Sequence, residues 1–206
     1  MSDMPPSPAR DTRSMILEAF ADELCAGGYL GVSLDSVAKA TGIKKASLYH
    51  HFPGGKEEIY RETALAEFVR QASYVQEALA MTGSLEDELV RIALVRCGSP
   101  DARPELDQQL YEATRHVSDE TRTQVSTVYL SSLIAPVEAL FARAVDAGEL
   151  LGDGSFLTWR FLEMAASVTP MPDDLGMPPE HRGPTPRADA AARAVVRLFL
   201  DGARPR

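Results

Sequence analysis

The sequence predicts an all-α protein. Apolar residues recur at helical spacing along almost the whole chain of 206 residues, and the alternation typical of strands is almost absent. Gly, Pro and Ser separate the apolar stretches, as they do where one helix ends and the next begins. A chain of this length can hold one medium domain or two small ones with a sizeable core.

Nine helices follow from this pattern. They cover residues 11–26, 34–41, 45–51, 56–81, 84–97, 104–117, 119–147, 154–168 and 187–202. Gly27 and Gly28 end the first helix, Ser33 is suited to be the N-cap of the second, and Gly42 closes the second in a left-handed turn. Pro136 predicts a kink or break within 119–147.

Loop signals divide the chain further. Residues 1–10 predict a flexible N-terminal arm, 11–55 a compact helical domain, and 56–206 a larger helical domain that the long fourth helix joins to the first. Six prolines between residues 169 and 186 predict a loop inside the larger domain.

Composition limits the possible functions. The net charge is −9, with −2 in residues 1–60 and the remaining −7 in the larger part. No apolar run approaches the roughly 18 to 20 residues that span a bilayer, and the N-terminus lacks the layout of a signal peptide, so we expect no membrane partner. Cys25 and Cys97 form neither a disulfide framework nor a CxxC pair, which favours a reducing, cytoplasmic location. For Cys97, an oxidant-sensing thiol and an inert buried thiol both remain open.

No catalytic motif is present. The four histidines lack metal-ligand spacing, and neither a glycine-rich phosphate loop nor a GxSxG elbow occurs. The sequence therefore predicts neither an enzyme, nor a metal site, nor a cofactor.

The most informative stretch is 33–57, SLDSVAKATGIKKASLYHHFPGGKE, which predicts two short helices around a glycine turn. Every fixed charge between Asp35 and Glu57 is positive, although the protein as a whole is acidic. Such a positive face on a negative body fits a protein that meets a polyanion with one surface. Burial of Val37, Ala38, Ile43, Leu48 and Phe52 would leave the basic and polar side chains of the second helix outside, as in a helix-turn-helix that reads the major groove.

Segment 12–60 resembles the DNA-binding domain of the TetR family of bacterial transcriptional regulators. The resemblance is carried by Phe20, Gly28, Val32-Ser33, Val37-Ala38, Gly42-Ile43, Leu48-Tyr49-His50-His51-Phe52 and Lys56-Glu57. It implies DNA contacts at Ser33, Lys45, Ala46, Ser47, Tyr49, His50, His51 and Lys56, to which the position of Lys44 at the start of the recognition helix adds a ninth. We expect Lys56 to hold a phosphate, because it opens a helix after a Pro-Gly-Gly turn. Asp35 stands where some members carry a basic contact, so the first helix of the motif contributes less.

The resemblance also implies a homodimer, a palindromic operator in double-stranded DNA and a ligand cavity in the larger domain. Side chains that combine apolar bulk with a polar tip, or that provide apolar lining, suggest a cavity near Tyr111, His116, Tyr129, Phe141, Trp159 and Met164. Segments 154–168 and 187–202 are rich in apolar and small residues, and we expect a dimer interface at Phe156, Trp159, Phe161, Ala165, Ala194, Val195, Leu198 and Phe199. A purely intramolecular core is the alternative for these two segments.

The function that the sequence favours is a ligand-responsive, dimeric repressor whose small-molecule effector is unidentified. One rival is a helical enzyme or small-molecule carrier in which the basic helix-turn-helix is incidental. Another is a nucleoid-type DNA binder without an operator.

Overall fold

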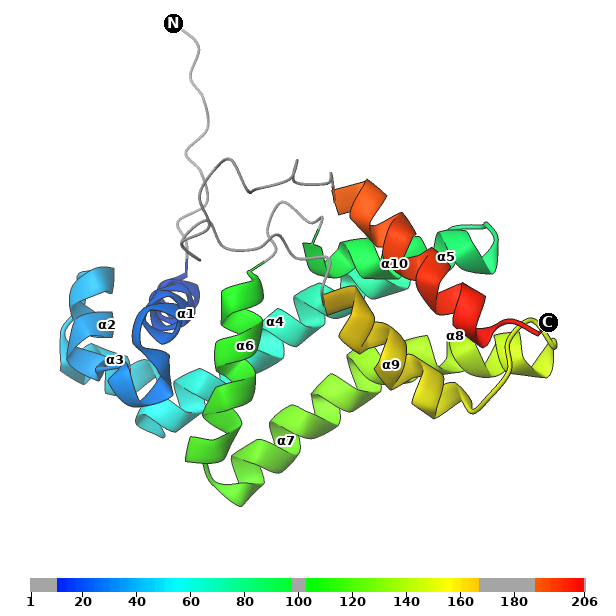
Figure 1. The fold of residues 1–206 in the computed structure, drawn as a ribbon. Helices are drawn as coiled ribbons and strands as arrows, with labels where there is room; N and C mark the ends of the chain where they lie inside the picture. The colour runs from blue at the N-terminus through cyan, green and yellow to red at the C-terminus, as the bar shows by residue number, and fades with distance from the viewer. Residues whose placement is uncertain (1–10, 98–102, 167–187, 206) are drawn as a thin grey trace, which may run out of the picture. The chain divides into compact units, whose positions relative to one another are not determined.

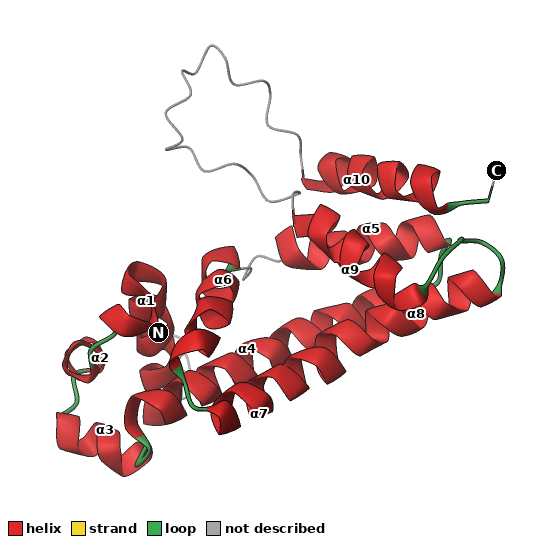
Figure 2. Ribbon diagram, turned by 60° about the horizontal axis from the view of Figure 1, so that its bottom comes forward, coloured by secondary structure: helices red, strands yellow, loops and turns green. Residues whose placement is uncertain are grey.

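The computed structural model describes residues 11–97, 103–166 and 188–205, and within them every regular element is helical (Figures 1 and 2). The elements are α1 (Thr12–Gly31), α2 (Leu34–Thr41), α3 (Lys45–His51), α4 (Gly55–Ala80), α5 (Leu85–Cys97), α6 (Pro104–Ala113), the 3-10 turn η1 (Thr114–His116), α7 (Asp119–Tyr129), the π-helical segment η2 (Leu130–Ile134), α8 (Ala135–Asp146), α9 (Gly154–Ala166) and α10 (Ala188–Ala203). The predicted all-α class is confirmed for these residues. The expected N-terminal arm at 1–10 and the expected Pro-rich loop at 169–186 lie outside them.

The chain forms two compact units. Unit 1 comprises Met1–Glu67 and Glu105–Thr127, and unit 2 comprises Phe68–Pro104 and Val128–Arg206. Three helices, α4, α6 and α7, therefore contribute residues to both units, α6 only through Pro104. Unit 1 includes the rest of α6 and most of α7, which the sequence-based division at residue 55 places with the larger domain.

Unit 1 has a core to which each of its first four helices contributes. Its fully buried side chains include Ile16, Phe20, Leu24, Val37, Leu48, Phe52, Ile59 and Tyr60. Full burial of one such apolar side chain stabilises the fold by about 1.5–3 kcal/mol. Helices α2 and α3 have only 8 and 7 residues, too short to be stable alone in water, so this shared core holds them in place.

Helix α1 consists of two helical parts joined at Gly28. The dihedral angles of Gly28, φ 65° and ψ 172°, are not helical, so the first part stops at the glycines as predicted. The sequence did not predict the short helical turn that follows, which ends where the Val32 N–H donates to the Gly28 carbonyl at 3.2 Å.

The core of unit 2 contains an aromatic cluster. The rings of Phe141 on α8, Phe161 on α9 and Phe199 on α10 lie with their centroids 5.3–5.6 Å apart, and their planes are inclined by 60–69°. Inclined pairs at this distance are a favourable arrangement for aromatic rings. Helix α10 also packs against α5.

The break expected at Pro136 is a change of helix type. The five residues of η2 are π-helical, and Pro136 follows as the second residue of α8. Proline has no N–H to donate to the preceding turn, so the regular α-helical ladder is interrupted there. Segment Asp119–Asp146 is, among the residues described, the one helix long and apolar enough by composition to cross a membrane. Core helices of soluble proteins share these properties, which makes the segment weak evidence for a membrane span.

Candidate nucleic-acid interface

Helices α2 and α3 and the turn between them form the predicted helix-turn-helix. The Ser33 hydroxyl caps α2 by accepting a hydrogen bond from the Asp35 N–H at 3.2 Å. Gly42 ends α2 with a φ of 70°, and its N–H donates to the Lys39 carbonyl at 3.2 Å. Both local predictions are confirmed, and both follow from conformational preferences of single residues.

The residues in and around α3 differ sharply in burial. Leu48 and the following Phe52 are fully buried. The predicted contact residues Lys44, Lys45, Ala46, Ser47, Tyr49 and His50 are exposed to solvent. Ser33 is exposed as well, and His51 is half-buried. The sequence therefore folds so that two apolar side chains anchor α3 in the core while its basic and polar side chains stay accessible.

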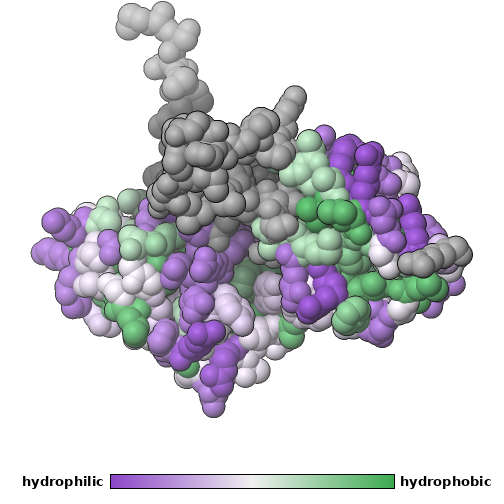
Figure 3. All heavy atoms as spheres, viewed as in Figure 1, coloured by the Kyte–Doolittle hydropathy of each residue, from purple (hydrophilic) through white to green (hydrophobic). Residues whose placement is uncertain are grey.

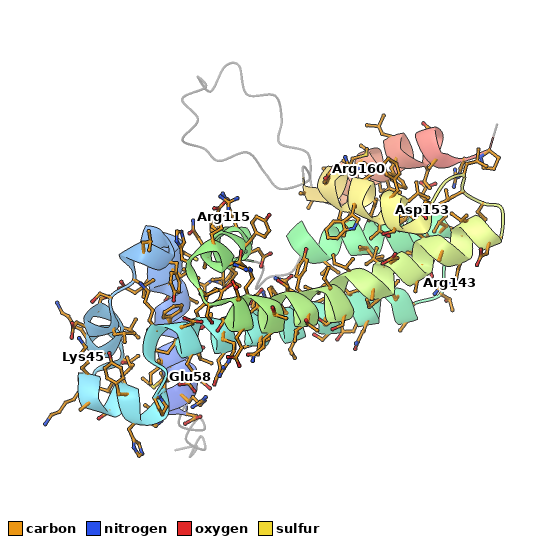
Figure 4. All side chains as sticks on the ribbon, turned by 90° about the horizontal axis from the view of Figure 1, so that it is seen from below. Lys45, Glu58, Arg115, Arg143, Asp153 and Arg160 are labelled. Atoms are coloured by element: carbon orange, nitrogen blue, oxygen red, sulfur yellow. The ribbon has the colours of Figure 1, made fainter. Side chains whose placement is uncertain are left out.

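Lys45 is held by an acidic partner on α2. Lys45 is labelled in Figure 4. Its Nζ donates to Oδ2 of Asp35 at 2.8 Å, and the two side chains remain 48% and 70% exposed. The hydrogen bond that Lys45 donates to Asp35 raises the pKa of the Lys45 ammonium. Both residues stand out in the sequence, but their pairing does not, because ten positions and a turn separate them.

The Pro-Gly-Gly turn brings Tyr49 close to the start of α4. Gly55 has a φ of 63°, and a Cβ at this position would lie 3.3 Å from Cε1 of Tyr49. Glycine therefore serves here both for its left-handed conformation and for the space that it leaves to the ring. Tyr49 is nevertheless 45% exposed, so part of its ring stays accessible.

Lys56 lies against the junction of α1 and α2. Its Nζ donates to the Val32 carbonyl at 2.8 Å and lies 4.6 Å from the centroid of the Tyr29 ring. Burial lowers the pKa of its ammonium. In this structure Lys56 joins α4 to the end of α1, a role that the sequence did not suggest, and its phosphate contact remains a prediction.

Arg13, on α1, contacts residues of both α3 and α4. Nothing in the sequence singled it out. Its Nη1 donates to the His51 carbonyl at 2.6 Å, its Nε donates to Oε2 of Glu62 at 3.0 Å, and its guanidinium lies 4.2 Å from the centroid of the Phe52 ring. A planar guanidinium can make these contacts together because it carries donors along its edge and stacks through its face. Arg13 thus fixes the end of α3 against α1 and α4.

Tyr29 is the centre of a second cluster in unit 1. Its ring meets that of Tyr60 edge-on at 5.5 Å and stacks on that of His116 at 6.2 Å. Burial, together with the nearby charge of Glu57, raises the pKa of Tyr29 to about 12. Tyr60 is fully buried and donates to the Leu110 carbonyl at 2.9 Å, so α6 packs on α4 within the unit.

Glu57 connects α4 to the start of α7. Its carboxylate accepts hydrogen bonds from the hydroxyl of Ser118 and, at 3.0 Å, from the Ser118 N–H. The hydroxyl bond, followed by one from Thr121, lowers the pKa of Glu57. A charged acceptor thereby satisfies donors at the N-terminus of α7, where negative charge is favourable.

Unit 2 contains a cavity that is partly open to solvent. Its enclosed volume is only about 40 Å³; the figure rises to about 420 Å³ when all the space between the atoms out to open solvent is counted. It is lined by Gln71, Val75, Ile92, Val95, Tyr129, Leu133, Ile134, Val137 and Leu162. The lining is apolar except for one amide and one phenol, and two of its residues, Leu133 and Ile134, come from the π-helical segment η2. A change of helix type is often found at functional sites.

The six side chains predicted to bind a ligand are divided between the two units. Tyr129 lines the cavity, whereas Tyr111 and His116 belong to unit 1 and Phe141 lies inside the aromatic cluster. Trp159 is 40% exposed, and Met164 is half-buried on α9. The aliphatic lining was missed because Val, Leu and Ile carry no sequence signal that separates a cavity wall from a core. The side chain of Cys97 lies outside the described residues.

The residues predicted at the dimer interface fall into two groups. Phe161, Ala165 and Phe199 are buried within unit 2, as the intramolecular alternative expected for them. Phe156, Trp159, Ala194 and Leu198 are exposed, and Val195 is half-buried. Figure 3 shows hydrophobic residues on the visible surface of unit 2 over the region of α9 and α10. Three large apolar side chains, Phe156, Trp159 and Leu198, are therefore accessible on these two helices.

Comparison with known proteins agrees with this geometry. Residues 16–63 match the family model of bacterial regulatory proteins, tetR family. LmrA of Bacillus subtilis, an HTH-type transcriptional regulator, is 41% identical over 63 residues, which are 30% of this chain and 34% of LmrA. The matched stretches span between 19% and 39% of the length of the curated relatives.

The likeness in fold extends along nearly the whole chain. The structure of PfmR, a TetR family transcriptional regulator from Thermus thermophilus, is 26% identical, has a TM-score of 0.71, and matches 90% of this chain and 97% of its own. AibR, whose structure is in complex with isovaleryl coenzyme A and operator DNA, is 19% identical, has a TM-score of 0.67, and matches 91% of this chain and 97% of its own. The helical part that follows the helix-turn-helix is therefore of the same architecture as in these proteins.

Proposed function

We propose that this chain, which belongs to the TetR family of bacterial regulatory proteins, is a ligand-responsive repressor that binds a palindromic operator as a homodimer. The observation that carries the proposal is the exposed face of α3. Its basic and polar side chains are exposed to solvent, while Leu48 and Phe52 anchor the helix in the core. A recognition helix needs this arrangement in order to enter a major groove without unfolding.

The proposed DNA contacts divide by their chemistry. Lys44, Lys45, Ala46 and Ser47 lie at the N-terminal end of α3 and would contact base edges and nearby phosphates. The hydroxyls of Ser33 and Tyr49, together with His50, His51 and Lys56, would contact the backbone and set the orientation of the protein. Phosphate contacts carry most of the affinity, and base contacts carry the choice of sequence.

The cavity in unit 2 is the proposed effector site. Its lining suits a ligand that is largely apolar and presents a polar group to Gln71 or Tyr129. AibR, a protein of the same fold, has been solved with a coenzyme A thioester and operator DNA together. Because α4 contributes residues to both units, an effector that prefers one position of α4 would change the spacing of the two recognition helices.

The exposed apolar side chains of α9 and α10 are the proposed dimer interface. Phe156, Trp159 and Leu198 would be buried against the same residues of a second subunit, as in other two-fold symmetric assemblies. A homodimer would place two recognition helices on half-sites about one or more DNA turns apart. We place such a repressor in the bacterial cytoplasm, where its operator lies.

The proposal is tested by measuring binding of the purified protein to its own upstream intergenic DNA and to random duplex across a salt series. Preference for the upstream DNA by roughly a thousandfold or more is the margin expected of a specific regulator. Lys45→Ala should relax the choice of sequence, whereas Lys56→Ala should weaken binding to all duplexes about equally. Failure to bind any duplex at low salt would exclude the proposed function.

A further inference from the structure

One acidic residue lies on the surface that the proposed function assigns to DNA. Asp35 is in the first turn of α2, and it is the single Asp or Glu between Ser33 and Lys56. Its carboxylate is 70% exposed and accepts a hydrogen bond from Lys45 Nζ at 2.8 Å. A negative charge at this place opposes the approach of phosphates, so its presence in the motif requires an explanation.

We propose that Asp35 is a specificity-determining residue, which positions the Lys45 ammonium and prevents it from strengthening binding to DNA of arbitrary sequence. The inference rests on the proposed DNA-binding function and deepens it. Asp35 would act through Lys45 and through the repulsion of backbone phosphates, without touching a base itself.

The chemistry of the ammonium supports this role. Lys45 has three N–H donors, and Asp35 occupies one of them. A guanine edge, with its O6 and N7 acceptors, can take a remaining donor while Asp35 keeps the first. A phosphate can also take a remaining donor, but it brings a negative charge next to the Asp35 carboxylate, and this repulsion offsets part of the gain.

The exchange is possible because the ion pair is accessible. Both side chains are largely exposed, and a pair of this kind changes an equilibrium by up to about fivefold. The pair is therefore weak enough to let the Lys45 ammonium adjust to a well-placed base edge, and strong enough to reduce binding where no such partner exists. This difference between correct and incorrect DNA is what determines specificity.

A purely structural role predicts the opposite result. A carboxylate in the first turn of α2 also favours the helix through its dipole. If Asp35 served only that purpose, its neutralisation would loosen α2 and weaken binding to every duplex. On our proposal, neutralisation strengthens binding to random DNA.

The test compares Asp35→Asn with the control Asp119→Asn. Asp119 is in the first turn of α7, is 90% exposed and pairs with Arg122, so the control removes the same charge from an equivalent ion pair outside α2 and α3. Fluorescence anisotropy would give Kd for random duplex and for a duplex selected by the wild-type protein from a random library, at several salt concentrations. Thermal unfolding of each variant would show that it is folded.

Asp35→Asn should bind random duplex about two- to fivefold more tightly than the wild type. The slope of log K against log salt should steepen by about 0.9 per subunit, the change expected from one additional phosphate contact. Affinity for the selected duplex should change less, so the ratio of specific to random affinity falls. Asp119→Asn and the charge-preserving Asp35→Glu should resemble the wild type, and in a Lys45→Ala background Asp35→Asn should lose most of its effect.

Two results would overturn the inference alone: unchanged or weakened random-duplex binding by Asp35→Asn, or an equal gain in Asp119→Asn. An equal gain in Asp119→Asn would show that the change in net charge alone explains the tighter binding to random duplex. Absence of binding to any duplex by all variants would overturn the proposed function, and this inference with it.

Discussion

Replacement of Tyr60 by Phe tests how firmly α6 is joined to the DNA-binding unit. The Tyr60 hydroxyl is fully buried and donates to the Leu110 carbonyl at 2.9 Å. Phenylalanine keeps the ring, and with it the edge-on contact with Tyr29 at 5.5 Å, and it removes only the hydrogen bond. A buried carbonyl that loses its donor costs about 1–3 kcal/mol, so the free energy of unfolding should fall by that amount.

Denaturation in urea at a fixed concentration of protomer measures this loss. A fixed concentration is needed because the stability of a homodimer depends on it. The slope m should be unchanged, since no additional surface is exposed in the folded protein. In a thermal scan the midpoint should fall by roughly 2–4 °C for each kcal/mol.

Tyr49→Phe is the matched control, because it removes the same hydroxyl from a side chain that is 45% exposed. Its stability should stay within about 0.5 kcal/mol of the wild type, while its affinity for all duplexes should fall through loss of a phosphate contact. Tyr60→Phe should instead lose stability and keep its affinity for DNA. If Tyr60→Phe were as stable as the wild type, or if both variants lost the same stability, the hydrogen bond to Leu110 would not be what holds α6 in unit 1.

Three further outcomes are expected. Lys56→Ala should lower the free energy of unfolding by about 1–3 kcal/mol in urea denaturation, because a charged hydrogen-bond donor is lost, and should weaken operator and random duplex by the same factor. Glu57 has a lowered pKa because of Ser118, so its contribution to stability is present above about pH 4.3, the value for an unperturbed glutamate, and is lost as pH falls further. Glu57→Gln should therefore flatten the acid limb of a plot of unfolding free energy against pH. Leu198→Glu should shift the protein from dimer towards monomer in sedimentation velocity, whereas Leu30→Glu, equally exposed but in unit 1, should leave the dimer intact.

The helix-turn-helix could be predicted because its rules are local. Ser33 caps the residue two positions ahead, and Gly42 takes a left-handed conformation that almost only glycine adopts freely. The burial of Leu48 and Phe52 follows from helical spacing. Each of these inferences depends on local sequence alone and does not require contacts between residues that are far apart in the sequence.

The remaining features of the site depend on contacts that sequence spacing does not encode. Lys56 donates to a carbonyl 24 positions earlier, and Arg13 meets Glu62 across 49 positions. The side chain of His116 combines an apolar ring with polar nitrogen atoms, which suggested a ligand-binding role. In the structure its ring stacks on that of Tyr29 in unit 1. A polar tip on an apolar side chain therefore identifies a residue that needs a partner, but not which partner it finds.

The internal partners of the lysines determine how the salt dependence of DNA binding should be understood. Lys39 and Lys44 are exposed, whereas Lys45 and Lys56 each donate to a protein oxygen. If only the first two neutralised phosphates, a homodimer would release counterions at about four sites and log K would fall with log salt at a slope of about −3.6. Engagement of all four lysines would double the slope to about −7.2. Equal slopes on operator and random duplex are expected if Lys56 contacts phosphates on both and Lys45 stays paired with Asp35. A steeper slope on operator would mean instead that Lys45 or Lys56 leaves its internal partner only on the correct sequence, and would contradict the equal weakening predicted for Lys56→Ala.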